Sequence, residues 1–146
     1  MGRFRTAGVH LADVMSDIET TTVCEDGYAC TSQVGDFDLQ IDATDETGPN
    51  PNAALVATYA SCFLPAFRVG GQQRGHDDLG EIQIDASAEL DDEDDLASIA
   101  FDLHVEADLD DDTAAEIVDR AEGICHVHSA LKEELLADVT VHSGAF

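Results

Sequence analysis

Positive charge is scarce in this chain: six lysine and arginine residues stand against 32 aspartate and glutamate residues among 146, and the formal net charge is −26. So few cations cannot neutralise the phosphates of a nucleic acid. The same excess of negative charge opposes binding to anionic membrane surfaces. We therefore expect neither nucleic acid nor a membrane among the partners of this protein.

The acidic residues are spread over turns, helix starts and strand faces, so they predict a solvated coat and not one acidic tail. Repulsion among so many carboxylates destabilises a compact chain at low salt, a property that halophilic proteins exploit. We infer a halophilic protein from a salt-rich cytoplasm. The first residues lack the long apolar core of a secretory signal, and four cysteines in such a chain indicate a reduced, cytoplasmic compartment.

Several motifs that carry chemistry are also missing. The chain contains no glycine-rich nucleotide motif and no serine nucleophile elbow. The acid-rich stretches 91–95 and 108–112 lack the glycine and the terminal glutamate of an EF-hand. Cys125 and His128 have the spacing of half a metal site, but no matching pair of ligands stands elsewhere. We expect no cofactor and no bound metal.

A chain of this length is expected to form one domain with a real core. Residues 1–14 differ from the rest in composition, with Arg3 and Arg5 and no acid before Asp13. We expect residues 1–14 to be a poorly ordered upstream extension. Residues 15–146, with Met15 as the natural start, are then a single domain.

Alternating apolar and polar side chains predict strands, and apolar residues at helical spacing predict helices. The expected order is three strands, a buried helix, two strands, two helices and a final strand. This order predicts an α+β fold with a mainly antiparallel sheet. The best-defined segments are strands at 37–43, 81–90 and 99–109, a helix at 113–123 that opens with a capping box, a short helix at 126–135, and a strand at 137–141.

Residues 53–69 are almost all apolar, which predicts a long helix buried on all sides rather than on one stripe. Pro51 suits its first turn, Pro65 is expected to kink the helix or open it locally, and Gly70-Gly71 to end it or mark a hinge. The length is borderline for a membrane span, but polar residues interrupt the run, so we favour the core helix of a soluble protein.

Two cysteines flank an Asp-Gly turn near the start of the chain. A two-residue loop would pair Cys24 with Ala29 and Cys30 with Val23. The two sulfurs would then point to opposite faces of the hairpin, which disfavours a disulfide. We interpret Cys24 and Cys30 as structural cysteines, with a redox pair as the alternative.

Two motifs carry a resemblance to a known family. Asn50-Pro51, followed by a small apolar helix that ends in Ser61-Cys62-Phe63, resembles the first cysteine motif of the OsmC/Ohr family. Cys125, in the stretch CHVHSAL, resembles its second cysteine motif, and the separation of 125 − 62 = 63 residues also fits. The resemblance covers most of residues 17–143. It implies the OsmC-like fold with a long central helix, and an intertwined homodimer with sites at the subunit interface.

The resemblance also implies a chemistry. In this family a thiol on the central helix attacks the O–O bond of an organic hydroperoxide, and a second thiol converts the resulting sulfenic acid to a disulfide. A dithiol reductant then resets the pair. This assigns Cys62 as the nucleophile and Cys125 as the resolving cysteine. The apolar neighbours that favour an organic hydroperoxide over hydrogen peroxide are Leu55, Tyr59, Phe63 and Phe67.

The chain departs from the family motif at two points. Asn52 takes the place of the family's glutamate, and its arginine has no counterpart between residues 37 and 49. A cysteine in the middle of a helix needs a cation or a hydrogen-bond donor to lower its pKa. The candidate supporting residues are Asn52, Tyr59, His126 and His128, and the candidate cations are Arg68 and Arg74.

Plainer interpretations stand beside this chemistry. His126 and His128 fit a helix-start cap and a surface side chain as well as a catalytic role. The alternative function is a non-catalytic OsmC-like protein that binds a small apolar ligand or senses redox state through its thiols.

Overall fold

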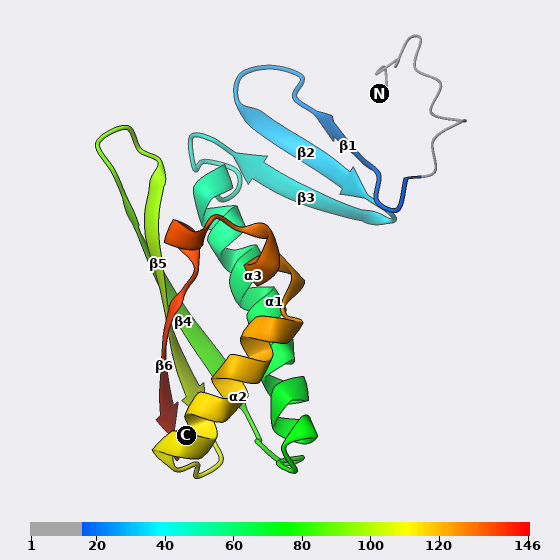
Figure 1. Cartoon of the computed structure of the whole chain (residues 1–146). Helices are drawn as coiled ribbons and strands as arrows, with labels where there is room; N and C mark the ends of the chain where they lie inside the picture. The colour runs from blue at the N-terminus through cyan, green and yellow to red at the C-terminus, as the bar shows by residue number, and fades with distance from the viewer. Residues whose placement is uncertain (1–15) are drawn as a thin grey trace. The chain divides into compact units, whose positions relative to one another are not determined.

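The structure, a computed structural model, describes residues 16–146, so the extension expected at residues 1–14 lies outside the described residues. The chain divides into two compact units, Met1–Ala54 and Leu55–Phe146, and each is described by itself. The single domain expected at residues 15–146 stays a prediction. The α+β fold and its order of elements agree with the sequence analysis, with a short 3₁₀ helix added before the last strand (Figure 1).

Three antiparallel strands in the order β1-β2-β3 form the sheet of the first unit. They are β1 (Thr20–Val23), β2 (Ala29–Val34) and β3 (Phe37–Asp42) (Figure 1). Gly35, in the tight turn between β2 and β3, has a φ of 61°, a conformation that glycine adopts without strain.

The β1–β2 hairpin has a different register from the one predicted. A two-residue loop would pair Cys24 with Ala29, but the observed register pairs Thr22 with Ser32, which leaves a longer turn. β1 ends at Val23, which pairs with Thr31, and one more step of the same register toward the turn sets Cys24 opposite Cys30. The prediction that the two sulfurs point to opposite faces is therefore wrong, because a shift of one residue exchanges the faces of a strand.

Asp42, at the end of β3, is the one fully buried charged residue in the described part of the chain. Its two carboxylate oxygens accept hydrogen bonds from the hydroxyl and the N–H of Thr44 and of Thr47, at 2.6 to 3.0 Å. These bonds, that of the Thr44 hydroxyl above all, hold the pKa of Asp42 well below its usual range, although burial acts in the opposite direction. The carboxylate thereby fixes the loop that follows β3.

Replacing Asp42 with asparagine is expected to destabilise the protein at neutral pH, because an amide cannot accept hydrogen bonds from both threonines. The pKa is lower in the folded state than in the unfolded state. The carboxylate therefore stabilises the fold above about pH 4, and this contribution is lost as the pH falls below that value. Thermal midpoints of wild type and Asp42→Asn, measured in molar salt, should converge as the pH falls.

Asp38→Asn, at an exposed carboxylate of the same strand, is the matched control and should leave the midpoint unchanged. A gap between Asp42→Asn and wild type that stays constant through the acid range would contradict the assignment of the carboxylate.

A mixed sheet and two long helices build the second unit. The sheet has the order β4-β5-β6, in which β4 (Ile82–Leu90) runs antiparallel and β6 (Asp138–Ser143) parallel to the central strand β5 (Leu96–Val105). Helix α1 (Pro51–Gln73), of which the residues from Leu55 onward belong to this unit, and α2 (Asp111–Ile124) lie on one side of the sheet (Figure 1). The short helix α3 (His126–Ala130) and the 3₁₀ helix η2 (Glu133–Leu135) connect α2 to β6.

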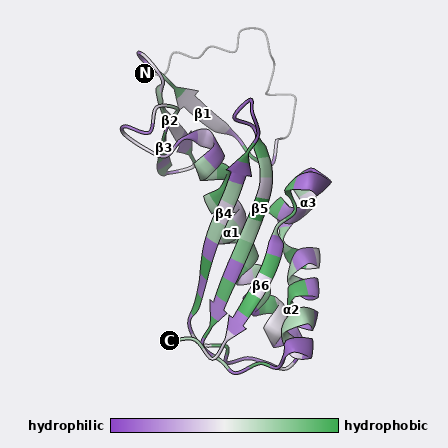
Figure 2. Ribbon diagram, turned by 90° about the vertical axis from the view of Figure 1, so that its left-hand side faces the viewer, coloured by the Kyte–Doolittle hydropathy of each residue, from purple (hydrophilic) through white to green (hydrophobic). Residues whose placement is uncertain are grey.

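One apolar cluster joins the sheet to the helices. Alternate residues of β5 are buried, as the sequence predicts, and polar residues stand between them (Figure 2). β4 is buried at Ile82 and half-buried at Ile84, whereas its later apolar residues, Ala86, Ala88 and Leu90, are exposed. The cluster contains Ile99, Phe101, Leu103 and Val105 of β5, Tyr59, Phe63 and Phe67 of α1, and Ile117 and Ala121 of α2.

Helix α1 is buried along one stripe only, which comprises Tyr59, Phe63, Ala66, Phe67, Gly70 and Gly71. The prediction of burial on all sides is therefore wrong for the single chain, because only one face of the helix meets the sheet and α2. Among the described residues α1 is the one helix long and apolar enough to cross a bilayer, with 28% of that window buried. Its aromatic side chains fill the core, which is the position of a core helix rather than of a membrane span.

Gly70 and Gly71 lie inside α1, so the prediction that they end the helix is wrong. A Cβ atom on Gly70 would stand 3.2 Å from the carbonyl oxygen of Ile117, and one on Gly71 would stand 2.8 Å from the Leu79 side chain. Gly70 therefore allows α2 to pack closely against α1, and Gly71 allows the segment after α1 to do so.

The ends of the later helices also differ from the prediction. The carboxylate of Asp110 accepts the N–H of Thr113 at 2.7 Å, so Asp110 is the N-cap and the predicted capping box at Thr113 lies within the first turn. Gly123 does not close α2, which runs one residue further to a C-cap at Cys125. The helix expected at 126–135 is divided into α3 and η2.

Candidate active site

The two cysteines of the family resemblance lie in the same unit. Cys62 is near the middle of α1, half-buried, and packs against the apolar core. Cys125 is buried at the joint between α2 and α3, where it is the C-cap of one helix and the N-cap of the next. Its backbone is extended, with φ −70° and ψ 115°, so that the chain turns there and α3 begins immediately afterwards.

Three hydrogen-bond donors meet the sulfur of Cys62. Partial burial raises the pKa of Cys62, but the N–H groups of Val127 and His126 and the thiol of Cys125 donate to the sulfur, and the net effect lowers the pKa. The two N–H groups belong to the first turn of α3, where backbone donors have no partner within the helix. Main-chain donors from another helix thus stabilise the Cys62 thiolate.

Cys125 is shifted in the opposite direction. Burial raises the pKa of Cys125 to about 11, although the backbone N–H groups of His128 and Val127 act against it. The backbone nitrogen of His128 lies 3.4 Å from the Cys125 sulfur. The hydrogen bond to Cys62 and the negative charge there raise the Cys125 pKa further. The negative charge of the pair therefore resides on Cys62, while Cys125 keeps its proton.

Tyr59 fastens the segment that carries these donors. It is fully buried on α1, and its hydroxyl lies 2.7 Å from Nδ1 of His128 and accepts the N–H of Ala137 at 2.9 Å. Burial raises the pKa of Tyr59 by more than the hydrogen bond from the N–H of Ala137 lowers it, so the hydroxyl stays protonated. Tyr59 thus holds the chain between α3 and β6 against α1.

The candidate cations make other contacts. Nη2 of Arg68 donates to the carbonyl oxygen of Gly80 at 2.9 Å, and Arg74 pairs with Glu116 at 3.4 Å on the surface. Neither arginine is among the groups that shift the pKa of Cys62. Two of the three donors that do so are backbone groups, which leave no residue-type signature in a sequence. The one feature of the sequence that pointed to these donors was the position of Cys125 at the joint between two helices.

The other predicted supporting residues have different surroundings. Asn52 lies in the first turn of α1, nearly three turns before Cys62, and its equivalence to the family's glutamate stays a prediction. His126 contributes its backbone N–H while its side chain is exposed, whereas the His128 side chain is bound to Tyr59. Within residues 16–146, no group of three or more histidine, cysteine or acidic residues is arranged to hold a metal ion.

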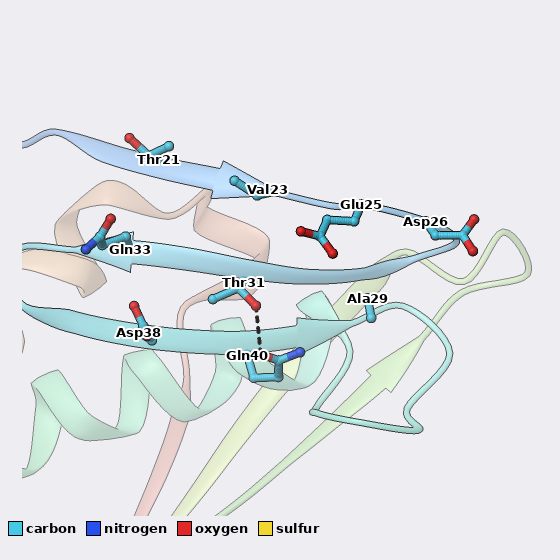
Figure 3. A pocket seen from close by; sticks show the side chains of 9 residues that line it. All are labelled: Thr21, Val23, Glu25, Asp26, Ala29, Thr31, Gln33, Asp38 and Gln40. Atoms are coloured by element: carbon cyan, nitrogen blue, oxygen red, sulfur yellow. Dashed lines mark hydrogen bonds between the residues drawn. The ribbon is translucent and has the colours of Figure 1, made fainter. Parts of the chain in front are cut away.

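A hollow of about 610 Å³ lies on one face of the sheet in the first unit (Figure 3). Its lining is made of hydroxyl, amide, carboxylate and small apolar side chains, among which the Thr31 hydroxyl donates to Gln40 at 2.9 Å. Cysteine and histidine are absent from this lining, so the hollow offers no nucleophile for thiol chemistry.

Two interacting thiols of unequal acidity on an α+β scaffold are the arrangement expected of a thiol-redox protein. The family model described as OsmC-like protein matches residues 43–140. The chain belongs to this family, and the predicted family and fold are confirmed.

Known proteins are similar to this chain in sequence or in fold. An uncharacterized protein of Haloferax volcanii is 76% identical over 132 residues, which are 90% of this chain and 100% of that protein, and its source is consistent with the inferred halophile. The OsmC like protein from Mycoplasma pneumoniae is similar in structure, with a TM-score of 0.77, 17% identity, and coverage of 88% of this chain and 97% of that one. The organic hydroperoxide resistance protein OhrB of Bacillus subtilis has a TM-score of 0.61, 24% identity, and coverage of 86% and 96%.

Tyr59→Phe is expected to raise the pKa of Cys62, because α3 loses its anchor at His128. The same substitution leaves the buried N–H of Ala137 without its acceptor, which should lower the free energy of unfolding by about 1–3 kcal/mol. The pH dependence of Cys62 alkylation and denaturant unfolding, both in molar salt, measure the two effects. Tyr28→Phe, at an exposed tyrosine, is the control and should change neither. Lost stability with an unchanged Cys62 pKa would make Tyr59 a core residue only.

Proposed function

We propose that this protein is a thiol-dependent peroxidase that reduces organic hydroperoxides through Cys62 and Cys125. The observation that carries the proposal is the contact between a thiol acidified by hydrogen-bond donors and a second thiol kept protonated by burial. A sulfur nucleophile needs the first property, and a partner that forms a disulfide only after the first oxidation needs the second. The name of the similar Bacillus subtilis protein, an organic hydroperoxide resistance protein, supports the same chemistry.

The reaction has three steps. The Cys62 thiolate attacks one oxygen of the hydroperoxide, the O–O bond breaks, Cys62 becomes a sulfenic acid, and the alkoxide leaves as an alcohol after taking a proton. The Cys125 sulfur then attacks the Cys62 sulfur, which forms a disulfide and releases water. A dithiol reductant exchanges with this disulfide, restores both thiols and departs as its own disulfide.

An apolar stripe on α1 supports an organic substrate. Leu55, Cys62 and Val69 are seven residues apart, so they lie on one face of the helix. Leu55 is 36% and Val69 39% exposed, and each therefore flanks the thiol with accessible apolar surface. Tyr59, Phe63 and Phe67 are buried in the core, which leaves Leu55 as the accessible member of the apolar neighbours expected from the sequence.

The proposal includes the partners that the family resemblance implies, namely a second copy of the chain and a dithiol reductant, in the cytoplasm. The exposed apolar side of α1, with Leu55 and Val69, is a surface that supports burial against a second subunit.

The test is an assay of cumene hydroperoxide consumption with dithiothreitol as reductant. It is run in molar salt, with circular dichroism as the check that the protein is folded, because an unfolded acidic chain would give a false negative. We expect turnover, and faster turnover with cumene hydroperoxide than with hydrogen peroxide. A folded protein without turnover would overturn the peroxidase and leave the redox-sensing or ligand-binding alternative. A preference for hydrogen peroxide would contradict the apolar substrate site.

A further inference from the structure

The turn between β1 and β2 carries a second pair of cysteines, which the proposed peroxidase does not use. Cys24 is exposed, Cys30 is half-buried, and both are free thiols. They belong to the first unit, which is described independently of the unit that holds Cys62 and Cys125.

The register of the hairpin brings the two cysteines together. Thr22 stands opposite Ser32, and the hydroxyl oxygens of these two side chains are 2.8 Å apart, so both point to one face. Val23 pairs with Thr31 at the end of β1. Because side chains alternate along a strand, the next two residues toward the turn, Cys24 and Cys30, lie on the same face as Thr22 and Ser32. Residues directly opposite each other in antiparallel strands have Cα atoms about 4.5–5.5 Å apart. A disulfide spans Cα separations of about 4.4–6.8 Å, so the backbone fits this bond.

The thiols already interact in the reduced chain. Burial raises the pKa of Cys30, and the hydrogen bond and charge of Cys24 add to this shift. The Cys24 sulfur also donates to the carbonyl oxygen of Gly27 at 3.1 Å, which orients it over the turn. Cys24 is therefore the accessible thiol and Cys30 the sheltered partner beside it.

We propose that Cys24 and Cys30 are a second redox site, a cross-strand dithiol that small cationic or neutral disulfides oxidise to an intramolecular disulfide. The Cys24 thiolate attacks one sulfur of the small disulfide, the S–S bond breaks, and one small thiol leaves with a proton. Cys30 then attacks the Cys24 sulfur of the mixed disulfide and releases the second small thiol. The protein loses two electrons and two protons, and the small disulfide becomes two thiols.

The charge around the turn selects the oxidant. Glu25 and Asp26 follow Cys24 directly and are exposed, in a chain with a net charge of −26. An anionic disulfide is repelled from such a surface, while a cationic one is attracted, and salt screens both effects. Cystamine, which carries two ammonium groups, is therefore the probe of choice, and the dianionic disulfide of 3-mercaptopropionate is its counterpart.

The experiment uses the full chain with Cys62→Ser and Cys125→Ser, so that only the hairpin thiols remain, in molar salt with its fold checked by circular dichroism. After cystamine treatment we expect the titratable thiols to fall from two to none, with a mass loss of two hydrogens and no adduct. The same treatment of wild type, followed by cleavage after Glu25, should leave the peptides of Cys24 and Cys30 joined until a reductant is added. This second measurement stands if the double variant fails to fold.

Controls complete the test. Cys30→Ser in the same background should keep one stable cystamine adduct on Cys24, because no thiol resolves it. Two separate adducts on the chain that retains both thiols, or a disulfide between two chains, would overturn the intramolecular site. At the lowest salt that keeps the protein folded, cystamine should react at least about tenfold faster than the dianionic disulfide. Equal rates would overturn the selection by charge.

Discussion

Cys62→Ser is expected to reduce hydroperoxide consumption to that of buffer without protein. A hydroxyl at this position stays protonated despite the N–H groups of Val127 and His126, because its pKa lies far above that of a thiol, so the nucleophile is lost. The fold should be retained, since the substitution exchanges one small side chain on a half-buried position. Stopped-flow measurement with cumene hydroperoxide in molar salt gives the rate for both proteins.

Cys125→Ser separates the first oxidation from the second. Without reductant, this variant should consume one equivalent of hydroperoxide and stop at a sulfenic acid on Cys62, which dimedone traps, whereas wild type ends as a disulfide. Cys24→Ser, far from this chemistry in sequence, is the cysteine control and should turn over like wild type. Full turnover in Cys62→Ser, or a sulfenic acid on Cys125 in wild type, would reverse or remove the assigned roles.

Phe101→Ala is expected to lower the free energy of unfolding by about 3–5 kcal/mol, which is the usual cost of removing a fully buried aromatic ring. The ring is buried on β5, with its centroid 4.7 Å from that of Tyr59 and 5.5 Å from that of Phe63. Its removal leaves a cavity directly beneath the residue that anchors α3. Denaturant unfolding in molar salt measures the loss.

Phe146→Ala is the matched control, because Phe146 is 64% exposed and the same atoms are removed from the surface. This variant should remain within about 0.5 kcal/mol of wild type. Equal losses for the two variants would contradict the position of Phe101 in the core.

The order of elements and the buried face of β5 could be predicted because both depend on local periodicity. The location of Cys62 within the long helix, and of Cys125 at the joint between two helices, could also be predicted from the surrounding sequence. The extent of burial of α1 could not be predicted. An apolar composition shows that a helix can be buried on all sides, but it does not show how many other elements of the same chain pack against it. The ends of α2 were misplaced because Asp110 and Thr113 are both good caps, and the earlier one competes successfully.

The chemistry around the thiols was less predictable than the fold. The sequence offers Arg68 and Arg74 as cations for Cys62, whereas the backbone N–H groups of Val127 and His126 are among the groups that lower its pKa. Main-chain groups are the same in every residue, so only the three-dimensional arrangement identifies them. The pairing of Cys24 with Cys30 was missed for a different reason, because turn length alone sets the register of a hairpin and an Asp-Gly turn permits more than one.

The pH dependence of Cys62 alkylation by iodoacetamide decides whether the hydrogen-bond donors stabilise the Cys62 thiolate. The measurement is made in molar salt on a chain with Cys24→Ser and Cys30→Ser, and the modified peptides are quantified by mass spectrometry. We expect Cys62 to ionise at a lower pH than the cysteine of an unstructured peptide measured alongside, and Cys125 to stay unmodified until far higher pH. Ionisation of Cys62 at or above the pH found for the peptide cysteine, or modification of Cys125 first, would contradict this expectation.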